Sequence, residues 1–400
     1  MSFQSSRRLA AVQAPVIAVV SRWIAETPGT ISLGQGVVSY GPPADVIAAA
    51  LRASARADAH GYGPIEGEPE LVAAIERKLR QDNAIVVRPD SCVFVTAGCN
   101  LAFTHAMLAI VEPDDEVILP VPYYFNHEMA VQMAGGRAVP VRTTAGHQLD
   151  LDAIAGAITP RTRAVVTVSP NNPTGAVYDE ASLCRLNALC AARGVFHVSD
   201  ETYEYFTYGR AAHFSPGGIP GAAAHTISLF SLSKAFGMAG WRVGYLVVPQ
   251  ALSDAVGKIQ DTLLICATVV AQHAAVAALE IGRAHAAAHL PALDRTRGRM
   301  LQALSAPGMP CDVVEPGGAF YYFLKVRTQL DAMTLTERLI REHRVAVTPG
   351  SAFGDRDGCA VRVSYGALDS ETVAEGLGRL VAGLSALAGA LALCLAGWWS

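Results

Sequence analysis

The stretch SLSKAFGMAGWRVG, residues 231–244, decides how the rest of the chain is interpreted. It follows an apolar run at residues 226–230 and leads into a second run at residues 243–248, which predicts a turn between two strands. Lys234 stands there among small, hydroxyl-bearing and glycine residues, and Arg242 follows eight positions later. A buried lysine is driven toward its neutral form and becomes nucleophilic. The alternative is a surface lysine in a loop, because lysine is seldom buried.

The composition limits what the chain can be. Its 400 residues are 51% hydrophobic and 16% charged, which is enough for two domains or for one large domain with a lobe. The net charge of −4 and the lack of a basic stripe argue against a nucleic-acid partner. The 8 cysteines form no C-x-x-C pair and show no zinc spacing, so we expect no metal site and reduced thiols in the cytoplasm.

Two apolar segments could be mistaken for targeting or membrane signals. Arg7 and Arg8 precede an apolar run, but Gln13 and Pro15 interrupt it and no clear cleavage site follows, so we expect no signal peptide. Residues 380–399 carry no charge and are long enough to span a bilayer. They are rich in glycine and alanine and continue a helical pattern that begins at residue 370. We therefore expect a packed final helix with a loose apolar tail rather than a membrane anchor.

Apolar, strand-like runs alternate with helical patterns through the middle of the chain. Helical patterns cover residues 102–111, 124–134 and 179–193. Several strands are continuously apolar, which is typical of sheets covered by helices on both faces. The pattern predicts an α/β fold with a mostly parallel sheet. The predicted strands are residues 92–96, 116–119, 138–141, 164–168, 195–199, 226–230 and 243–248.

A second unit follows the predicted sheet. One long helical pattern covers residues 251–288, and from about residue 291 a helix, short strands and a last helix predict a smaller α+β lobe. The first 45 residues have no place in the central sheet. We therefore predict a large domain at residues 46–290 and a small domain formed by residues 1–45 and 291–400. The short strands expected in the small domain are residues 318–325, 346–348 and 360–364.

Polar residues follow the ends of five predicted strands. They are Gly98, Tyr124, Asn172, Asp200 and Lys234. In open α/β sheets, ligands bind beyond the carboxyl ends of the strands. Five separate segments therefore point to one crevice.

One of these segments is suited to bind a phosphate. Thr96-Ala97-Gly98-Cys99-Asn100 ends a strand and opens a helix, where free N–H groups and the helix dipole favour an anion. An ordinary strand–helix turn has the same pattern. Ser231, Ser233 and Arg242 can supply further donors.

The other segments suit an aromatic ring that carries a protonated nitrogen. A buried Asp200 needs a positive partner, and a pyridinium is one, although a helix N-cap is the alternative. Asn172 can donate to a phenolate oxygen. The alternative is that it only stabilises the turn in which it lies. Tyr203 and Tyr124 offer a phenol and a flat face, or ordinary hydrophobic packing.

Arg362 lies in the small lobe, in the strand-like segment Val361-Arg362-Val363. Its side chain points opposite to those of the flanking valines, because successive residues of a strand face opposite sides. It can bind the carboxylate of a substrate, or it can face solvent.

Taken together, these residues resemble the class I/II aminotransferases, which are fold-type-I enzymes dependent on pyridoxal 5'-phosphate. The motifs fall in the family's order across nearly the whole chain. They are Gly61-Tyr62-Gly63-Pro64, Thr96-Ala97-Gly98, Pro122-Tyr123-Tyr124, Asn171-Asn172-Pro173-Thr174-Gly175, Asp200-Glu201-x-Tyr203, Ser231-x-Ser233-Lys234 with Gly240-x-Arg242-x-Gly244, and Arg362.

The resemblance implies a role for each residue. Lys234 forms the internal aldimine with the cofactor, and Asp200 pairs with the pyridinium nitrogen. Asn172 and Tyr203 hold the phenolic oxygen, and Tyr124 stacks on the ring. The catalytic residues are thus Lys234, Asp200 and Tyr203. The phosphate is bound by Gly98, Cys99, Asn100, Ser231, Ser233 and Arg242, with Tyr62 from the second subunit of a homodimer. Arg362, Gly36 and Asn172 bind the α-carboxylate of the substrate.

The implied reaction moves an amino group from an L-amino acid to a 2-oxo acid by a ping-pong mechanism. Residues 35–38, 203–206 and 258–261 are similar to plant aminotransferases that use methionine or aromatic amino acids. Aromatic or methionine substrates are therefore expected rather than aspartate. The residues expected to line their pocket are Tyr40, Tyr62, Tyr123, Phe320 and Tyr321.

Other reactions share this cofactor, because the fold alone does not fix the chemistry. A C–S β-lyase is the nearest alternative, followed by a biosynthetic oxidase or cyclase. A regulatory module that only binds the aldehyde is a third alternative.

Overall fold

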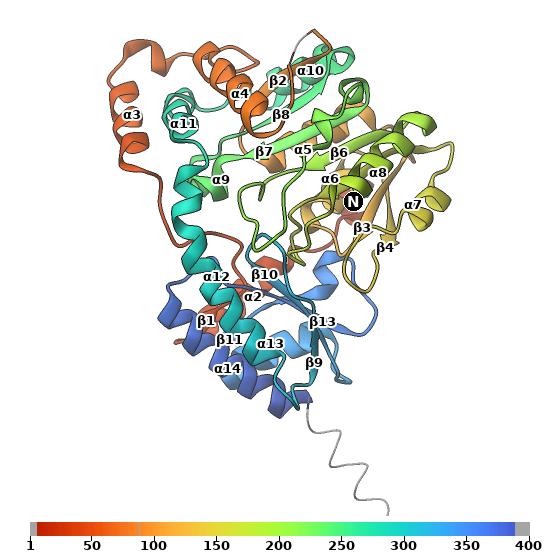
Figure 1. Cartoon of the computed structure of the whole chain (residues 1–400), viewed down its shortest axis with the longest axis vertical. Helices are drawn as coiled ribbons and strands as arrows, with labels where there is room; N and C mark the ends of the chain where they lie inside the picture. The colour runs from red at the N-terminus through yellow and green to blue at the C-terminus, as the bar shows by residue number, and fades with distance from the viewer. Residues whose placement is uncertain (1–5, 88, 389–400) are drawn as a thin grey trace, which may run out of the picture.

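A computed structural model describes residues 6–87 and 89–388, and a seven-stranded sheet forms its larger part (Figure 1). The strand order is β2-β8-β7-β6-β5-β3-β4. β8 runs antiparallel to β2 and β7, and the other neighbours are parallel, so the predicted mostly parallel sheet is confirmed. The strands are β2 (Ser91–Thr96), β3 (Glu116–Val121), β4 (Arg137–Arg142), β5 (Thr162–Val168), β6 (Phe196–Asp200), β7 (Thr226–Ser231) and β8 (Gly244–Pro249).

Helices cover both faces of this sheet, as its continuously apolar strands predict. One face packs on α5 (Cys99–Ile110), α6 (Phe125–Met133) and α10 (Ser253–Leu263). The opposite face packs on two helix pairs, and α3 (Ala44–Ser54) lies against the first of them. These pairs are α4 (Pro69–Asp82) with α11 (Val269–Ile281), and α7 (Leu151–Ala157) with α8 (Glu180–Arg193).

A second, antiparallel sheet lies below the first in Figure 1, and the long helix α12 (Ala284–Leu304) runs from one to the other. Its order is β12-β13-β10-β9, and it packs on α12, α13 (Ala332–His343) and α14 (Ser370–Ala388). A short parallel pair joins β1 to β11. The bounds are β1 (Ile31–Ser32), β9 (Cys311–Val313), β10 (Tyr321–Val326), β11 (Val345–Ala346), β12 (Thr348–Pro349) and β13 (Cys359–Ser364).

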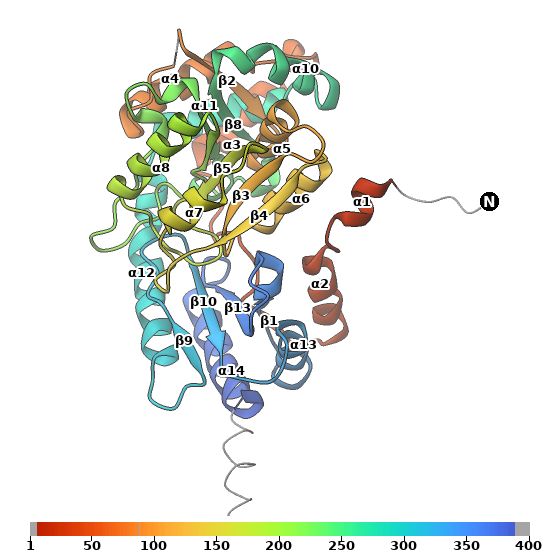
Figure 2. The same cartoon turned by 90° about the vertical axis from the view of Figure 1, so that its right-hand side faces the viewer.

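The N-terminal segment lies along one side of the molecule (Figure 2). α1 (Arg7–Ala11) contacts α6, and α2 (Val16–Glu26) packs on α13, so this segment touches both parts of the molecule. Pro15, which interrupts the apolar run of the sequence, stands directly before α2. The short helices are α9 (Leu232–Ala235), η1 (Ala57–His60), η2 (Pro216–Gly218), η3 (Ala222–Ala224), η4 (Ala239–Trp241), η5 (Gln250–Leu252) and η6 (Gly350–Phe353).

The prediction of one long helix over residues 251–288 is wrong. Three separate helices occupy this range, because Ile265 and Gly282 have positive φ angles of 67° and 63° that a right-handed helix cannot contain. α12 then continues past Pro291 without a break. The helix expected from Ser370 is confirmed as α14.

Two other sequence predictions concern the chain's organisation. The division into domains at residues 46–290 and at 1–45 with 291–400 stays a prediction. The apolar tail lies at residues 389–400, outside the described residues. Within residues 6–87 and 89–388, no helix combines the length and the apolar character that a membrane crossing needs.

The buried face of β7 gives a test of the central core. Leu229 has no exposed surface, so Leu229→Ala is expected to lower the free energy of unfolding by about 2–5 kcal/mol through lost contacts and a residual cavity. Leu108→Ala is the control, because Leu108 on α5 is 40% exposed and its loss should cost far less. Urea unfolding followed by circular dichroism measures both. Equal losses would contradict this description of the core.

Candidate active site

One cavity of about 320 Å³ opens where the large sheet meets the smaller one. It lies beyond the carboxyl ends of β5, β6 and β7, which end at Val168, Asp200 and Ser231. The predicted convergence of strand ends is therefore observed. The predicted site residues that line the cavity are Gly36, Cys99, Asn100, Tyr124, Asn172, Asp200, Tyr203, Ser231, Ser233, Lys234, Arg242 and Arg362.

Asp200 presents a buried carboxylate to this cavity. It is 4% exposed, and burial alone raises the pKa of a carboxyl group. His127 Nε2 lies 3.2 Å from Oδ2, and the backbone N–H of Thr202 donates to Oδ1 at 3.0 Å. These contacts outweigh burial, so the pKa of Asp200 is lowered. Asp200 therefore stays ionised and can pair with a cationic group of a ligand.

Lys234 lies in the single helical turn α9, directly after β7. Burial, and then the nearby guanidinium groups of Arg362 and Arg242, lower its pKa from 10.5 to about 8. Cys99 and Asp200 act in the opposite direction with smaller effect. Near neutral pH the amine is thus far easier to deprotonate than an ordinary lysine, which suits both imine formation and proton transfer.

The start of α5 forms a binding place for an anion. Gly98 precedes Cys99 with φ of 86°, and a Cβ atom there would collide with the guanidinium of Arg242. That guanidinium donates to the carbonyl of Ala97 at 3.1 Å and to that of Ala239 at 2.9 Å. Among the described residues, no side chain caps α5 at this end. Its first N–H groups and Arg242 can therefore meet a phosphate.

A chain of polar contacts joins the large sheet to Arg362. The Tyr203 hydroxyl lies 2.7 Å from that of Tyr321, and the Asn172 amide donates to Tyr203 at 3.4 Å. Arg362 Nη1 donates to Asn172 Oδ1 at 2.9 Å. Burial, followed by the neighbouring Tyr321, raises the pKa of Tyr203 well above 10, so its phenol stays protonated and can donate.

Arg362 is buried although it carries a full charge. It is 3% exposed, and its guanidinium lies over the ring of Tyr321, with 4.7 Å between Cζ and the ring centroid. Nη2 donates to the carbonyl of Gly34 at 2.5 Å. Its buried Nε has no partner within the part of the chain that the structure describes. A buried guanidinium with an unpartnered N–H among the described residues is suited to bind the carboxylate of a ligand.

The N-terminal segment supplies another part of the cavity wall, which is mostly apolar on α2 but also includes Ser21 and Gln35. Ile17, Val20 and Ile24 of α2 line it together with Phe125 of α6. The predicted aromatic lining is wrong for four residues of this chain, because Tyr40, Tyr123, Phe320 and Tyr321 do not line its cavity. Phe320 and Tyr321 are instead buried in the core around β10, with the Tyr321 hydroxyl turned to Tyr203.

Tyr62 lies apart from the other predicted residues. It is 84% exposed and does not line the cavity of its own chain. Its predicted role requires a second subunit, and it stays a prediction.

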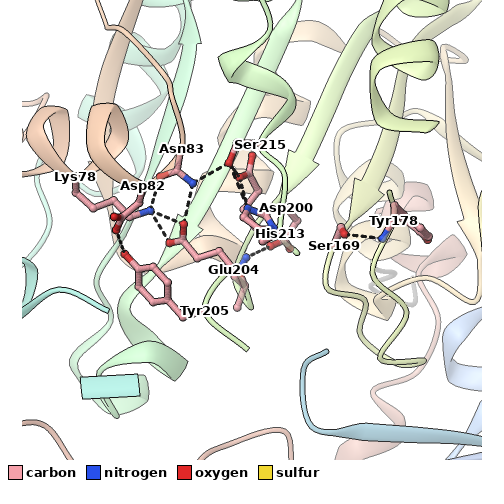
Figure 3. Close-up of polar contacts among 12 residues, drawn as sticks. Lys78, Asp82, Asn83, Ser169, Tyr178, Asp200, Glu204, Tyr205, His213 and Ser215 are labelled. Carbon is pink, nitrogen blue, oxygen red and sulfur yellow. Dashed lines mark hydrogen bonds and ion pairs between the residues drawn. The ribbon is translucent and has the colours of Figure 1, made fainter. Parts of the chain in front are cut away.

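A buried polar network lies beside the turn that follows Asp200 (Figure 3). Lys78 Nζ donates to both carboxylate oxygens of Glu204 at 2.5 and 2.6 Å, and these side chains are only 5% and 8% exposed. Asn83 donates to Glu204 at 2.9 Å and to Ser215 at 2.7 Å. Ser215 in turn donates to Glu201, the residue after Asp200. The ion pair of Lys78 with Glu204 and the hydrogen bonds of Asn83 and Ser215 therefore fix the turn after Asp200.

Sequence reasoning missed several residues of the site. His127 is three residues after Tyr124 on α6, and this helical spacing is the only signal that places it on the same side. No sequence pattern marks Thr202, Gly34 or Thr348 as residues of the site. The lining by α2 had no signal, because its residues form an ordinary amphipathic helix.

The described residues fit pyridoxal phosphate. The cavity has an ionised Asp200 for a pyridinium, donors at Asn172 and Tyr203 for a phenolic oxygen, and an open helix start for a phosphate. Lys234 faces the same space. The fold and this arrangement define an enzyme whose lysine carries an aldehyde cofactor.

Comparison with known proteins identifies the family. The model of "Aminotransferase class I and II" matches residues 28–380. A probable aspartate/prephenate aminotransferase of Aquifex aeolicus is 36% identical over 360 residues, covering 88% of this chain and 90% of the relative. An aromatic aminotransferase of Arabidopsis thaliana is 33% identical, covering 96% of both chains. The Thermus thermophilus aspartate aminotransferase solved with maleate has a TM-score of 0.87 at 34% identity, covering 96% of this chain and all of that one.

This chain therefore belongs to the class I and II aminotransferases. It is an enzyme that transfers an amino group between an amino acid and a 2-oxo acid, with pyridoxal phosphate as cofactor. The fold-type-I prediction is confirmed by the structural similarity.

The lowered pKa of Lys234 predicts a pH-dependent stability. In the unfolded chain this amine has its ordinary pKa of 10.5, and in the folded protein about 8, so below pH 8 the buried charge destabilises the fold. Lys234→Met is expected to stabilise the cofactor-free protein by about 3 kcal/mol at pH 7. The gain should shrink as the pH rises from 8 to 10.5. Denaturant unfolding across this range measures it, and a gain that does not change with pH contradicts the assignment.

The network behind Asp200 predicts a large effect of one substitution. Lys78→Met leaves the buried carboxylate of Glu204 without its cation, which should lower the free energy of unfolding by about 3–5 kcal/mol. Arg77→Met, at an exposed position on the same helix, should change it by less than about 0.5 kcal/mol. Thermal and urea unfolding compare the two. If both variants are as stable as the wild type, the ion pair does not support the turn.

Proposed function

We propose that the enzyme acts on L-amino acids with aromatic side chains or on methionine, with a 2-oxo acid as acceptor. The apolar wall formed by Ile17, Val20, Ile24 and Phe125 is the observation that supports this. Among the described lining residues, the cations are Lys234, Arg242 and Arg362, and all three have proposed roles other than binding a side chain. The relatives named for aspartate/prephenate and for aromatic substrates have similar identity, so they do not decide the substrate.

The roles that we propose for the site residues follow from their contacts. Arg362 binds the α-carboxylate of the substrate, with Asn172 and Gly36 beside it. Asp200 pairs with the ring nitrogen of the cofactor, and Tyr203 donates to its phenolic oxygen. Tyr124 lies against the ring. The phosphate is held by the start of α5 and by Ser231, Ser233 and Arg242.

Lys234 carries the proton transfer in this proposal. When bound, pyridoxal phosphate supplies a ring that withdraws electrons from the substrate Cα. The neutral amine of Lys234 would take the proton from Cα as a general base and, as a general acid, would pass it to C4′ of the cofactor. A pKa of about 8 keeps part of the amine neutral near physiological pH.

We propose a homodimer in which Tyr62 reaches the phosphate of the other subunit. Its support is an exposed apolar surface around this residue. Tyr62, Leu51, Leu263 and Ile47 are 84%, 67%, 51% and 45% exposed. The elements that carry or adjoin Tyr62, Leu51 and Ile47 are in contact, since α3 and η1 pack on each other and on α11, and the N–H of Gly63 donates to Cys266 Sγ at 3.3 Å, three residues after Leu263. Such a surface is typical of a subunit interface.

We place the enzyme in the cytoplasm. The support is that Cys99, Cys190, Cys311 and Cys359 are buried thiols, as in proteins of reducing compartments.

Substrate choice is tested by half-reaction rates with single amino acids, followed by the change in cofactor absorbance. Phenylalanine, tyrosine and methionine are expected to react at least about tenfold faster than aspartate, because a second carboxylate would be buried against an apolar wall. A clear preference for aspartate would refute the proposed substrate. Release of pyruvate and ammonia without a 2-oxo acid would indicate elimination instead.

Lys234→Ala is expected to abolish the imine absorbance and to lower turnover by at least about 10³-fold, because the variant lacks both the nucleophile and the general base. Spectra and steady-state assays of the purified variant test this. Wild-type turnover in the variant would refute the role of Lys234.

A further inference from the structure

Residues 34–41 connect the two functional ends of the cavity. At the first end, the carbonyl of Gly34 accepts hydrogen bonds from Arg362 Nη2 at 2.5 Å and from Thr348 Oγ1 at 3.0 Å. Gly34, Gln35 and Gly36 then line the cavity. The proposed carboxylate-binding residue is thus tied to the start of this segment.

At the other end, the segment contacts the lysine itself. The hydroxyl of Tyr40 donates to the backbone carbonyl of Lys234 at 3.0 Å. Burial raises the pKa of Tyr40 well above 10, so its phenol stays protonated and keeps donating. α9 has only four residues, and few internal hydrogen bonds hold such a short helix. A hydrogen bond from outside therefore has a large share in fixing where Lys234 stands.

The ring of Tyr40 is held in place by α12. It stacks on the imidazole of His289 with 3.7 Å between ring centroids and 5° between ring planes. His285, one turn earlier on α12, donates through Nε2 to the carbonyl of Gly41 at 3.2 Å and meets Tyr40 edge to face. The hydroxyl of Tyr40 thus has little freedom to leave the carbonyl of Lys234.

The backbone after Lys234 also fits tightly against this segment. Gly237 has φ of 63°, and a Cβ atom there would lie 2.5 Å from the Tyr40 carbonyl oxygen and 2.7 Å from the Gly41 carbonyl carbon. No side chain fits between them. A shift of residues 40–41 must therefore move the turn that carries Lys234.

We infer that Tyr40 is a positioning residue, which fixes the turn of Lys234 and couples it through residues 34–40 to carboxylate binding at Arg362. The inference rests on the proposed roles of Lys234 and Arg362. Tyr40 touches neither the substrate nor the reacting atoms in this account.

The test is Tyr40→Phe in the cofactor-loaded enzyme, which removes one hydroxyl and keeps the ring on His289. Its kcat is expected to fall by about threefold to tenfold with little change in KM, since one hydrogen bond to the lysine turn is lost. The pH midpoint of the imine absorbance should shift by roughly 0.5 unit. The control is Tyr322→Phe, whose hydroxyl donates to the carbonyl of Arg297 at 2.7 Å, away from the cavity. It should lose similar stability and keep the wild-type kcat and midpoint.

The outcomes separate the inference from the proposed function. If Tyr40→Phe and Tyr322→Phe have the same kcat and the same midpoint as an active wild type, the inference is overturned and the proposed function stands. If the wild type shows no imine and no transamination, the proposed function fails first.

His289→Ala and His289→Phe give a second test that leaves Tyr40 intact. The alanine variant should reproduce part of the loss in kcat, and the phenylalanine variant should restore it, because a flat ring again supports Tyr40. Equal activity of both variants with the wild type would overturn the part of the inference that concerns α12.

Discussion

Asp200 keeps its negative charge at a position that is almost completely buried, and the arrangement of the cavity depends on that charge. Burial alone would protonate the carboxyl group, so His127 and the N–H of Thr202 must stabilise its ionised form. In the same cavity, burial and then the nearby cations Arg362 and Arg242 lower the pKa of Lys234. The cavity thus keeps Asp200 ionised and makes the amine of Lys234 easy to deprotonate. An enzyme that forms imines near neutral pH needs both.

The fold brings these groups together by simple means. The strands β5, β6 and β7 end at the cavity, the segments after β2 and β3 add further residues, and the small sheet adds Arg362 from β13. Rigidity comes from contacts outside the cavity, such as the ion pair of Lys78 with Glu204 behind the turn of Asp200. The apolar wall comes from α2, a segment that contacts the small part of the molecule.

Much of this could be predicted from the sequence, because the decisive residues stand next to strong local patterns. The seven apolar runs became the seven strands of the large sheet, and four of the five residues singled out after them, Tyr124, Asn172, Asp200 and Lys234, line the cavity. What could not be predicted depends on tertiary packing. His127 meets Asp200 only because α6 packs on the large sheet, and Tyr40 meets Lys234 only because residues 34–41 run from Arg362 to the turn of Lys234. The prediction that Phe320 and Tyr123 line the substrate pocket was wrong for a similar reason. Both are large side chains that are buried in the core instead.

The central claim is that Lys234 carries the cofactor, and chemical trapping tests it most directly. The enzyme loaded with pyridoxal phosphate is reduced with borohydride, which fixes the imine as a stable amine, and the modified peptide is located by mass spectrometry. The chain has three other lysines, Lys78, Lys258 and Lys325, so the result is unambiguous. The pyridoxyl group is expected on Lys234 alone. A label on another lysine, or no label at all, would contradict the account.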